Sequence, residues 1–115
     1  MYKLTKIRES KALPILNEAY QSLKLRGSFD VHAFERKLRD LWDIGYHELY
    51  DVMEDALRDR RWRYVAVYYM ERINGPCLTC ELRDALEKAY GFEGWNDKDA
   101  WEAARARFWE GFKPA

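Results

Sequence analysis

The stretch WRYVAVYYMERINGPCLTCELRDALEKAYGF, residues 62–92, decides the fold class of this chain. Its first part is rich in β-branched and aromatic residues, as strands are, so a strand over 62–70 is the alternative to a helix there. The apolar side chains nevertheless recur at helical spacing: Trp62, Val65, Ala66, Tyr69, Met70 and Ile73. Since Asn74-Gly75-Pro76 is a strong helix stop, we predict a helix that ends at this break.

Two more helices are predicted after the break. Thr79 can cap the first of them, which ends at Gly91. Its inward face would consist of Leu82, Ala85, Leu86, Ala89 and Tyr90. Gly94 and Asn96 then frame a last helix, in which apolar residues recur at three- and four-residue spacing: Trp101, Ala104, Phe108 and Phe112.

The N-terminal half has the same punctuation. We predict a helix over about 13–25 that stops at Gly27, and a second one that Ser28 or Asp30 caps and that ends before Gly45. A third helix from Tyr46 reaches about Arg60, and either the chain kinks near 58–61 or one long helix runs on. The sequence therefore predicts an all-α fold, with five or six short helices in a compact orthogonal bundle.

Length and composition indicate one domain over residues 1–115. The chain has 48% hydrophobic and 35% charged residues, which is enough to bury a core without a disulfide or a metal ion. No apolar run approaches the length of a membrane span, and MYKLTKIRES has no apolar signal core. We therefore expect no membrane association and a cytoplasmic location.

Residues 62–112 carry a weak resemblance to a known superfamily. The helix, the Gly-Pro break and the Thr-capped short helix in YVAVYYMERINGPCLTCELRDALEKAYGF resemble the first two helices of helix-turn-helix and winged-helix DNA-binding domains. The resemblance implies that the next helix, 96–112, reads DNA, although it begins with Asn96-Asp97-Lys98-Asp99, where carboxylates would repel phosphate. Matching punctuation at Gly27 and Gly75 suggests a pseudo-repeat of three-helix units, 13–60 and 62–112.

Charge is segregated along the chain although the total is zero. The net charge is +4 over residues 1–28, −5 over 29–57 and +3 over 58–72. In the last of these segments arginines alternate with aromatic rings, a mixture that suits phosphates and unstacked bases. The predicted nucleic-acid-binding residues are Arg58, Arg60, Arg61, Trp62 and Arg63, with Arg105 and Arg107 on the last helix. The alternative is that these arginines complement a helix dipole and pair with the preceding acidic stretch.

Metal and catalytic chemistry have little support. Cys77 and Cys80 have the spacing of a redox pair or half a zinc site, but His32 and His47 do not complete a compact zinc module. His47 and Asp51 lie one helical turn apart, a spacing that can hold a metal ion or an acid/base pair. The simpler interpretation is that this helix has an acidic face in contact with solvent. No catalytic motif is present, so we expect no enzyme, no metal and no cofactor.

Three classes of function remain. The first is a small DNA-binding protein in transcription regulation that uses a helix-turn-helix-like unit and the Arg/aromatic patch, and a homodimer would double its contacts. The second is a protein interaction module, such as a phage or archaeal adaptor or inhibitor, with exposed aromatic residues as its docking surface. The third is a zinc or thiol switch at Cys77 and Cys80. We place the first class slightly ahead of the second.

Overall fold

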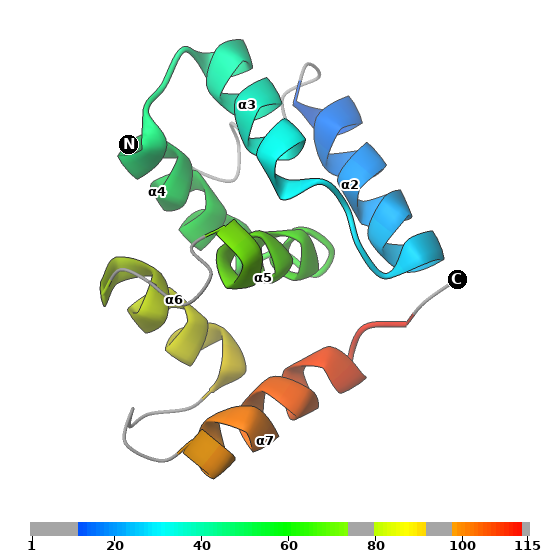
Figure 1. Cartoon of the computed structure of the whole chain (residues 1–115), viewed down its shortest axis with the longest axis vertical. Coiled ribbons are helices and arrows are strands. Elements are labelled where there is room, and N and C mark those ends of the chain that lie inside the picture. The colour runs from blue at the N-terminus through cyan, green and yellow to red at the C-terminus, as the bar shows by residue number, and fades with distance from the viewer. Residues whose placement is uncertain (1–11, 74–79, 92–97, 114–115) are drawn as a thin grey trace.

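The computed structural model of this chain describes residues 12–73, 80–91 and 98–113. Every regular element within these ranges is a helix, so the predicted all-α fold is confirmed (Figure 1). The described ranges contain six helices: α2 (Leu13–Arg26), α3 (Val31–Trp42), α4 (Tyr46–Ala56), α5 (Trp62–Ile73), α6 (Cys80–Tyr90) and α7 (Lys98–Glu110).

Helix α5 lies at the centre of the molecule. The side chains of residues 65–70 are at most 8% exposed, and the helix packs against α2, α3, α4 and α6. Figure 1 shows α5 end-on, with α2, α3 and α4 on one side and α6 and α7 on the other. A helix that is buried all round needs no polar face. This explains why residues 62–70 have the composition of a strand and still form a helix.

Local signals in the sequence fix several helix ends as predicted. Gly27 ends α2 with a φ of 75°, a left-handed conformation that glycine adopts without steric cost. Asp30 caps α3, where its Oδ1 accepts hydrogen bonds of 3.1 Å from the backbone N–H groups of His32 and Ala33. The caps proposed at Thr79 and Asn96 lie outside the described residues.

The boundary between α4 and α5 corrects one prediction. Helix α4 ends at Ala56 rather than near Arg60, and residues 57–61 form turns. The reason is Asp59, whose Oδ1 accepts hydrogen bonds from the N–H groups of Arg61 and Trp62 at 2.9 and 3.2 Å. In a continuous helix these N–H groups would donate to backbone carbonyls of the preceding turn. The Asp59 carboxylate accepts from them instead, and so begins a new helix. The chain therefore breaks at 57–61 and does not continue as one long helix.

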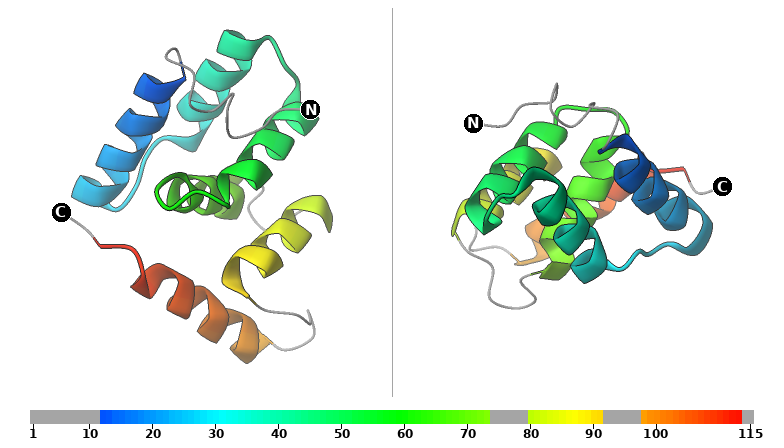
Figure 2. Two further views of the ribbon diagram at one scale, coloured as in Figure 1. Left: turned by 180° about the vertical axis from the view of Figure 1, so that it is seen from behind. Right: turned by 90° about the horizontal axis from the view of Figure 1, so that it is seen from above.

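Helix α7 and the residues after it close the bundle through aromatic contacts. The ring centroids of Phe108, Trp109 and Phe112 lie 5.1, 5.8 and 5.1 Å from that of Tyr64. Phe112 also lies 6.2 Å from Tyr20, and Figures 1 and 2 both show this end of α7 approaching α2. The last described helix is thus held beside the first.

The buried side chains form one core. This cluster runs from Ala12 to Ala104, so the two halves of the expected pseudo-repeat, 13–60 and 62–112, share their core through α5. None of the helices in the described ranges has the length and apolar character that a bilayer span requires.

Candidate nucleic-acid interface

Three of the predicted arginines lie in the turn between α4 and α5. Arg58, Arg60 and Arg61 are exposed, and together with Tyr20 and Asp59 they line an open depression of about 530 Å³. Arg58 is 79% exposed and reaches Asp55 at 3.8 Å, which is a long contact for an exposed ion pair. Such pairs contribute little to stability, so this guanidinium can turn towards another anion at small cost.

Trp62 does not share this exposure. Its side chain is 3% exposed and packs edge-on against Tyr20, with ring centroids 6.0 Å apart. The guanidinium carbon of Arg61 lies 4.7 Å above the Trp62 ring. Trp62 therefore belongs to the core, and the expectation that its ring stacks on bases does not hold.

Tyr20, and not Trp62, is the aromatic residue that lies beside the exposed arginines. It is half-buried on α2, and two cations lie over its ring, Lys24 Nζ at 5.2 Å and Arg61 Cζ at 6.0 Å from the centroid. It lies within the helix predicted over about 13–25, and no feature of the sequence singled it out as a binding residue. Nothing in the local sequence could have placed it beside arginines some forty positions away.

Arg63 does not line the depression that Arg58, Arg60 and Arg61 share. It covers the Tyr64 ring at 5.1 Å and donates a hydrogen bond of 3.3 Å to the Tyr64 hydroxyl. It lines a different depression, of about 320 Å³, together with Arg58, Lys88 of α6 and Phe108 of α7, so that Arg58 borders both depressions. The predicted stretch 58–63 is thus divided between two surfaces and the core.

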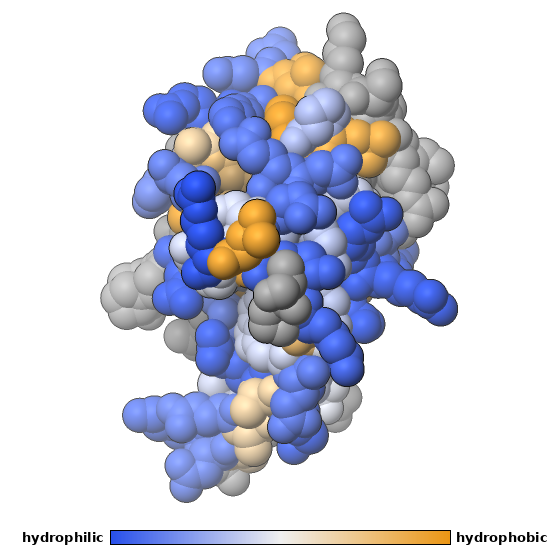
Figure 3. Space-filling model, turned by 90° about the vertical axis from the view of Figure 1, so that its right-hand side faces the viewer, coloured by the Kyte–Doolittle hydropathy of each residue, from blue (hydrophilic) through white to orange (hydrophobic). Residues whose placement is uncertain are grey.

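A groove of about 460 Å³ lies where the end of α2, the second half of α5 and α7 meet. Its cations are Lys24, Arg26, Arg72 and Arg105, and its apolar residues include Leu23, Leu25, Tyr68, Trp109 and Phe112. Leu25 is 71% exposed, the one large hydrophobic side chain in the described ranges that is exposed. The surface on this side of the molecule is mostly hydrophilic with small separate hydrophobic areas (Figure 3).

We call the turn that carries Arg58, Arg60 and Arg61 the arginine turn. It forms one surface with the groove, which we call the basic face: Tyr20, Lys24, Arg26, Arg58, Arg60, Arg61 and Arg72. Lys24 connects its two parts, because it lines the groove and also covers the Tyr20 ring that lines the other depression. The carboxylate of Asp59 lies within this face and caps α5. The basic face therefore carries an excess of positive charge on a chain whose total charge is zero.

Arg105 is held by the mostly buried carboxylate of Glu71, which the sequence did not indicate. Its Nε and Nη2 donate hydrogen bonds of 2.8 and 2.9 Å to the two oxygens of Glu71, whose side chain is 10% exposed. Glu71 also accepts from the Trp109 indole N–H at 3.2 Å and from the Tyr90 hydroxyl. This Glu71 cluster, Glu71, Tyr90, Arg105 and Trp109, joins α5, α6 and α7.

The chemistry of the Glu71 cluster shifts two pKa values. Burial, together with the negative charge of Glu71, raises the pKa of Tyr90 above its ordinary value. The hydrogen bonds that Arg105 donates to Glu71 raise the pKa of Arg105. Arg105 thus stays charged and fixed in position, as a bidentate partner of a carboxylate should be.

Helix α7 presents mixed charge on its outer side. Arg107 is exposed there, but so are Asp99 and Glu102 in the first turns of the helix and Glu110 at its end. Carboxylates at the start of a reading helix repel the phosphates and base edges that this part of the helix would approach. The outer side of α7 is therefore less suited to nucleic acid than the basic face.

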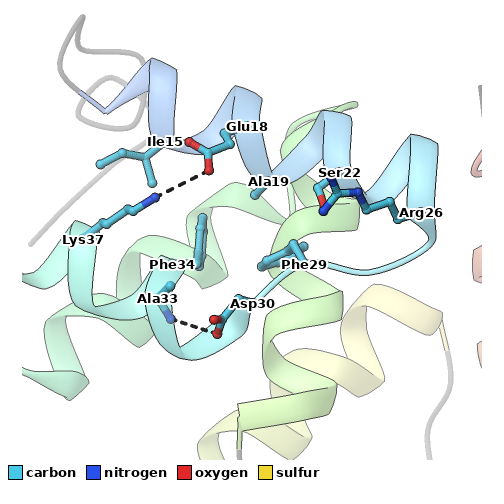
Figure 4. Close-up of a pocket in the computed structure, with 10 residues that line it drawn as sticks. All are labelled: Ile15, Glu18, Ala19, Ser22, Arg26, Phe29, Asp30, Ala33, Phe34 and Lys37. Carbon is cyan, nitrogen blue, oxygen red and sulfur yellow. Dashed lines mark hydrogen bonds and ion pairs between the residues drawn. The ribbon is translucent and has the colours of Figure 1, made fainter.

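Two further polar features are structural. The buried carboxylate of Glu35 on α3 accepts a hydrogen bond of 3.2 Å from the hydroxyl of Tyr69 on α5, and this bond joins the two helices. The same carboxylate lies 3.8 Å from Arg39 on its own helix. A small depression of about 180 Å³ lies between α2 and α3, where Glu18 and Lys37 pair at 3.5 Å (Figure 4). Neither holds a set of groups that could bind an ion or act on a substrate.

Metal chemistry finds no site in the part of the chain that the structure describes. No three His, Cys, Asp or Glu side chains converge there. Cys77 and the side chains of Cys80 and His47 lie outside that part. Comparison of the chain with family models, with curated proteins and with solved structures finds no match in any of the three.

Proposed function

We propose that this protein is a small nucleic-acid-binding regulatory protein, with DNA as the expected ligand, and that it holds phosphates on the basic face. One observation supports this most strongly. Segments far apart in the sequence, 20–26 and 58–61, bring their cations together around the half-buried ring of Tyr20. Arginines with free donors beside an aromatic ring suit a phosphate backbone.

Electrostatics restricts the attraction of nucleic acid to one patch of the surface. The chain has 20 Lys and Arg and 20 Asp and Glu residues, so it cannot attract DNA through its overall charge. Attraction over a surface patch falls off within about 10 Å at ordinary ionic strength. Binding through the basic face is therefore expected to be weak to moderate, and to decrease steeply as salt displaces the protein from phosphate.

The helix-turn-helix-like unit has a different role in this proposal from the one that the resemblance implies. Helices α5, α6 and α7 serve as the scaffold, and the phosphate contacts come from the turn before α5 and from Arg72 near its end. The acidic start of α7 argues for this assignment, since Asp99 and Glu102 would face the phosphates in the usual docking mode.

The direct test is fluorescence anisotropy of labelled single- and double-stranded DNA at low and at moderate salt. The variant Arg60→Glu, Arg61→Glu reverses two charges of the basic face, and Arg36→Glu, Lys37→Glu makes the same change in charge on exposed positions of α3. We expect the first variant to lose salt-sensitive binding and the second to keep most of it. Equal losses would show that only the total charge matters.

A protein partner is the second candidate function, and Leu25 is the observation that favours it. This side chain is 71% exposed at the edge of a groove that also holds Trp109 and Phe112. An exposed aliphatic residue beside half-buried aromatic rings resembles the anchor position of a docking surface. This function would be favoured over the first if no nucleic acid binds at low salt while an acidic polypeptide does bind.

A further inference from the structure

The groove between α2, α5 and α7 differs from the arginine turn in what lies beneath its cations. Trp109 and Phe112 line it with their rings 5.7 Å apart and nearly perpendicular, and both are half-buried. Tyr68 lies deeper, under the guanidinium of Arg72 at 4.9 Å. The groove therefore combines an aromatic lining with a cationic rim, whereas the arginine turn offers mainly charge.

Arg105 can contact a ligand in the groove without leaving Glu71. Its contacts with that carboxylate use Nε and Nη2, while a guanidinium has five N–H donors in all. The side chain is 44% exposed and lines the groove. Because Glu71 fixes the guanidinium in place, an anion that binds there meets an ordered donor, which reduces the entropy lost on binding.

The charges of the groove complement a polyanion. Four cations line it against the single carboxylate of Glu71, which Arg105 already neutralises. Through Lys24 and Tyr20 the cations continue to Arg61, so that a ligand with evenly repeated negative charges could follow the whole basic face. A strand of phosphates has this repeat, and an acidic peptide does so only with a suitable sequence.

We propose that the groove receives an unpaired base, so that the protein prefers single-stranded nucleic acid to duplex. This inference rests on the proposed function and adds the class of ligand to it. A duplex keeps its bases stacked inside and presents phosphates, which would engage the arginine turn and leave the aromatic lining unused. A single strand offers a base face to the aromatic rings and a phosphate to Lys24, Arg72 or Arg105. The volume, about 460 Å³, lies in the range of sites for small organic groups.

The test compares three labelled probes of about 15 nucleotides, a length within the usual site sizes of single-strand binders: oligothymidylate, a duplex, and an abasic strand with the same phosphates. We expect oligothymidylate to bind roughly five-fold or more tighter than either of the others, since stacking on aromatic side chains contributes at least this much. An abasic strand that binds as tightly as oligothymidylate would overturn the inference, because it would show that bases add nothing.

Variants at the groove make the test specific. Leu25→Glu adds a negative charge at a 71% exposed position and should not disturb the fold, and Leu25→Gln is its uncharged control. Trp109→Leu removes the ring, and Trp109→Phe retains a ring without the indole N–H. We expect Leu25→Glu and Trp109→Leu to abolish the preference for oligothymidylate and to change duplex binding much less. A preference that survives both variants would place the base elsewhere and overturn the inference.

The failure of this inference can be told apart from the failure of the proposed function. If single strand, duplex and abasic strand bind with equal affinity and all three lose binding as salt is added, the basic face holds phosphates and the groove holds no base. If no probe binds at low salt, the proposed function fails and the inference fails with it. A poly-glutamate of matched length serves as a competitor. If it competes as strongly as oligothymidylate does, the groove is a site for acidic protein segments, and the inference is overturned.

Discussion

The turn 57–61 and helix α5 are neighbours with similar composition and opposite surroundings. Both combine arginines with apolar or aromatic residues, yet the arginines of the turn are exposed, and from Trp62 onwards the aromatic side chains are buried. Asp59 separates them, because its carboxylate caps α5 and begins a helix in which residues 64–70 are all buried. The difference shows that a continuous Arg/aromatic pattern in a sequence can be part surface and part core, divided at one capping residue.

The largest effect on stability is expected at Trp62, the first residue of α5 and part of the core. Trp62→Ala should lower the free energy of unfolding by about 3–5 kcal/mol, because it removes a buried aromatic side chain that packs on Tyr20. Urea unfolding followed by circular dichroism measures this change. Trp62→Phe, which retains a ring, should lose much less, and a loss below about 1 kcal/mol for the alanine variant would mean that the ring is not in the core.

The second effect concerns Glu71, which lies on the side of α5 that faces α6 and α7. Glu71→Gln should lower the free energy of unfolding by about 2 kcal/mol, because the four hydrogen bonds that three side chains donate to Glu71 lose a charged acceptor that is mostly buried. The matched control is Glu110→Gln on the exposed end of α7, which we expect to change stability by less than about 0.5 kcal/mol. Similar values for the two variants would contradict the structural role of the Glu71 cluster.

The same cluster predicts how stability depends on alkaline pH. The pKa of Tyr90 is raised in the folded protein, so its contribution to stability is fully present below the unfolded tyrosine pKa of about 10 and is lost as the pH rises above that value. Above pH 10 the free energy of unfolding should fall by up to about 1.4 kcal/mol per pH unit from this one group.

Tyr90→Phe isolates this contribution from those of the other tyrosines. The variant loses the hydrogen bond to Glu71 at neutral pH, and its stability should then fall less steeply than that of the wild type between pH 9 and pH 11, roughly the range that spans the unfolded pKa. Parallel pH profiles for the two proteins would show that Tyr90 titrates as it does in the unfolded chain.

The smallest effect tests the boundary itself. Asp59→Ala removes the cap of α5 and should lower the free energy of unfolding by about 1 kcal/mol. Asp59→Ser retains an acceptor at this position and should recover most of the loss, which thermal unfolding of the two variants can resolve. If serine is no better than alanine, the charge of Asp59 and not its hydrogen bonds determines where α5 begins.

The sequence predicted the parts of the fold that depend on neighbouring residues. Gly27 and Asp30 act locally, so their effects on α2 and α3 could be foreseen, and the helical spacing of residues 62–73 outweighed their strand-like composition. A kink near 58–61 was one of the two alternatives, but Asp59 was not identified as its cause, because it lies among the arginines 58–61, where no apolar spacing marks a helix boundary. Helical periodicity does not reveal that a carboxylate will compete for the backbone donors of the next turn.

The candidate site was less predictable, because its residues meet only through tertiary contacts. Tyr20 and Arg61 are 41 positions apart, and Glu71 and Arg105 are separated by 34. Arg105 was predicted as a phosphate contact since nothing in the local sequence indicates that Glu71 pairs with it. The exposed arginines of the turn could be identified from composition, but the ring beside them could not.

The most direct measurement of the central claim is the salt dependence of DNA binding by the wild type and by Arg60→Glu, Arg61→Glu. Each phosphate contact contributes about 0.7 to the slope of log K against log salt for a single strand and about 0.9 for a duplex. Binding through the basic face predicts that the variant, if it still binds, has a slope smaller by roughly 1.4 to 1.8. An unchanged slope, or a wild type that binds no DNA at low salt, would contradict the account.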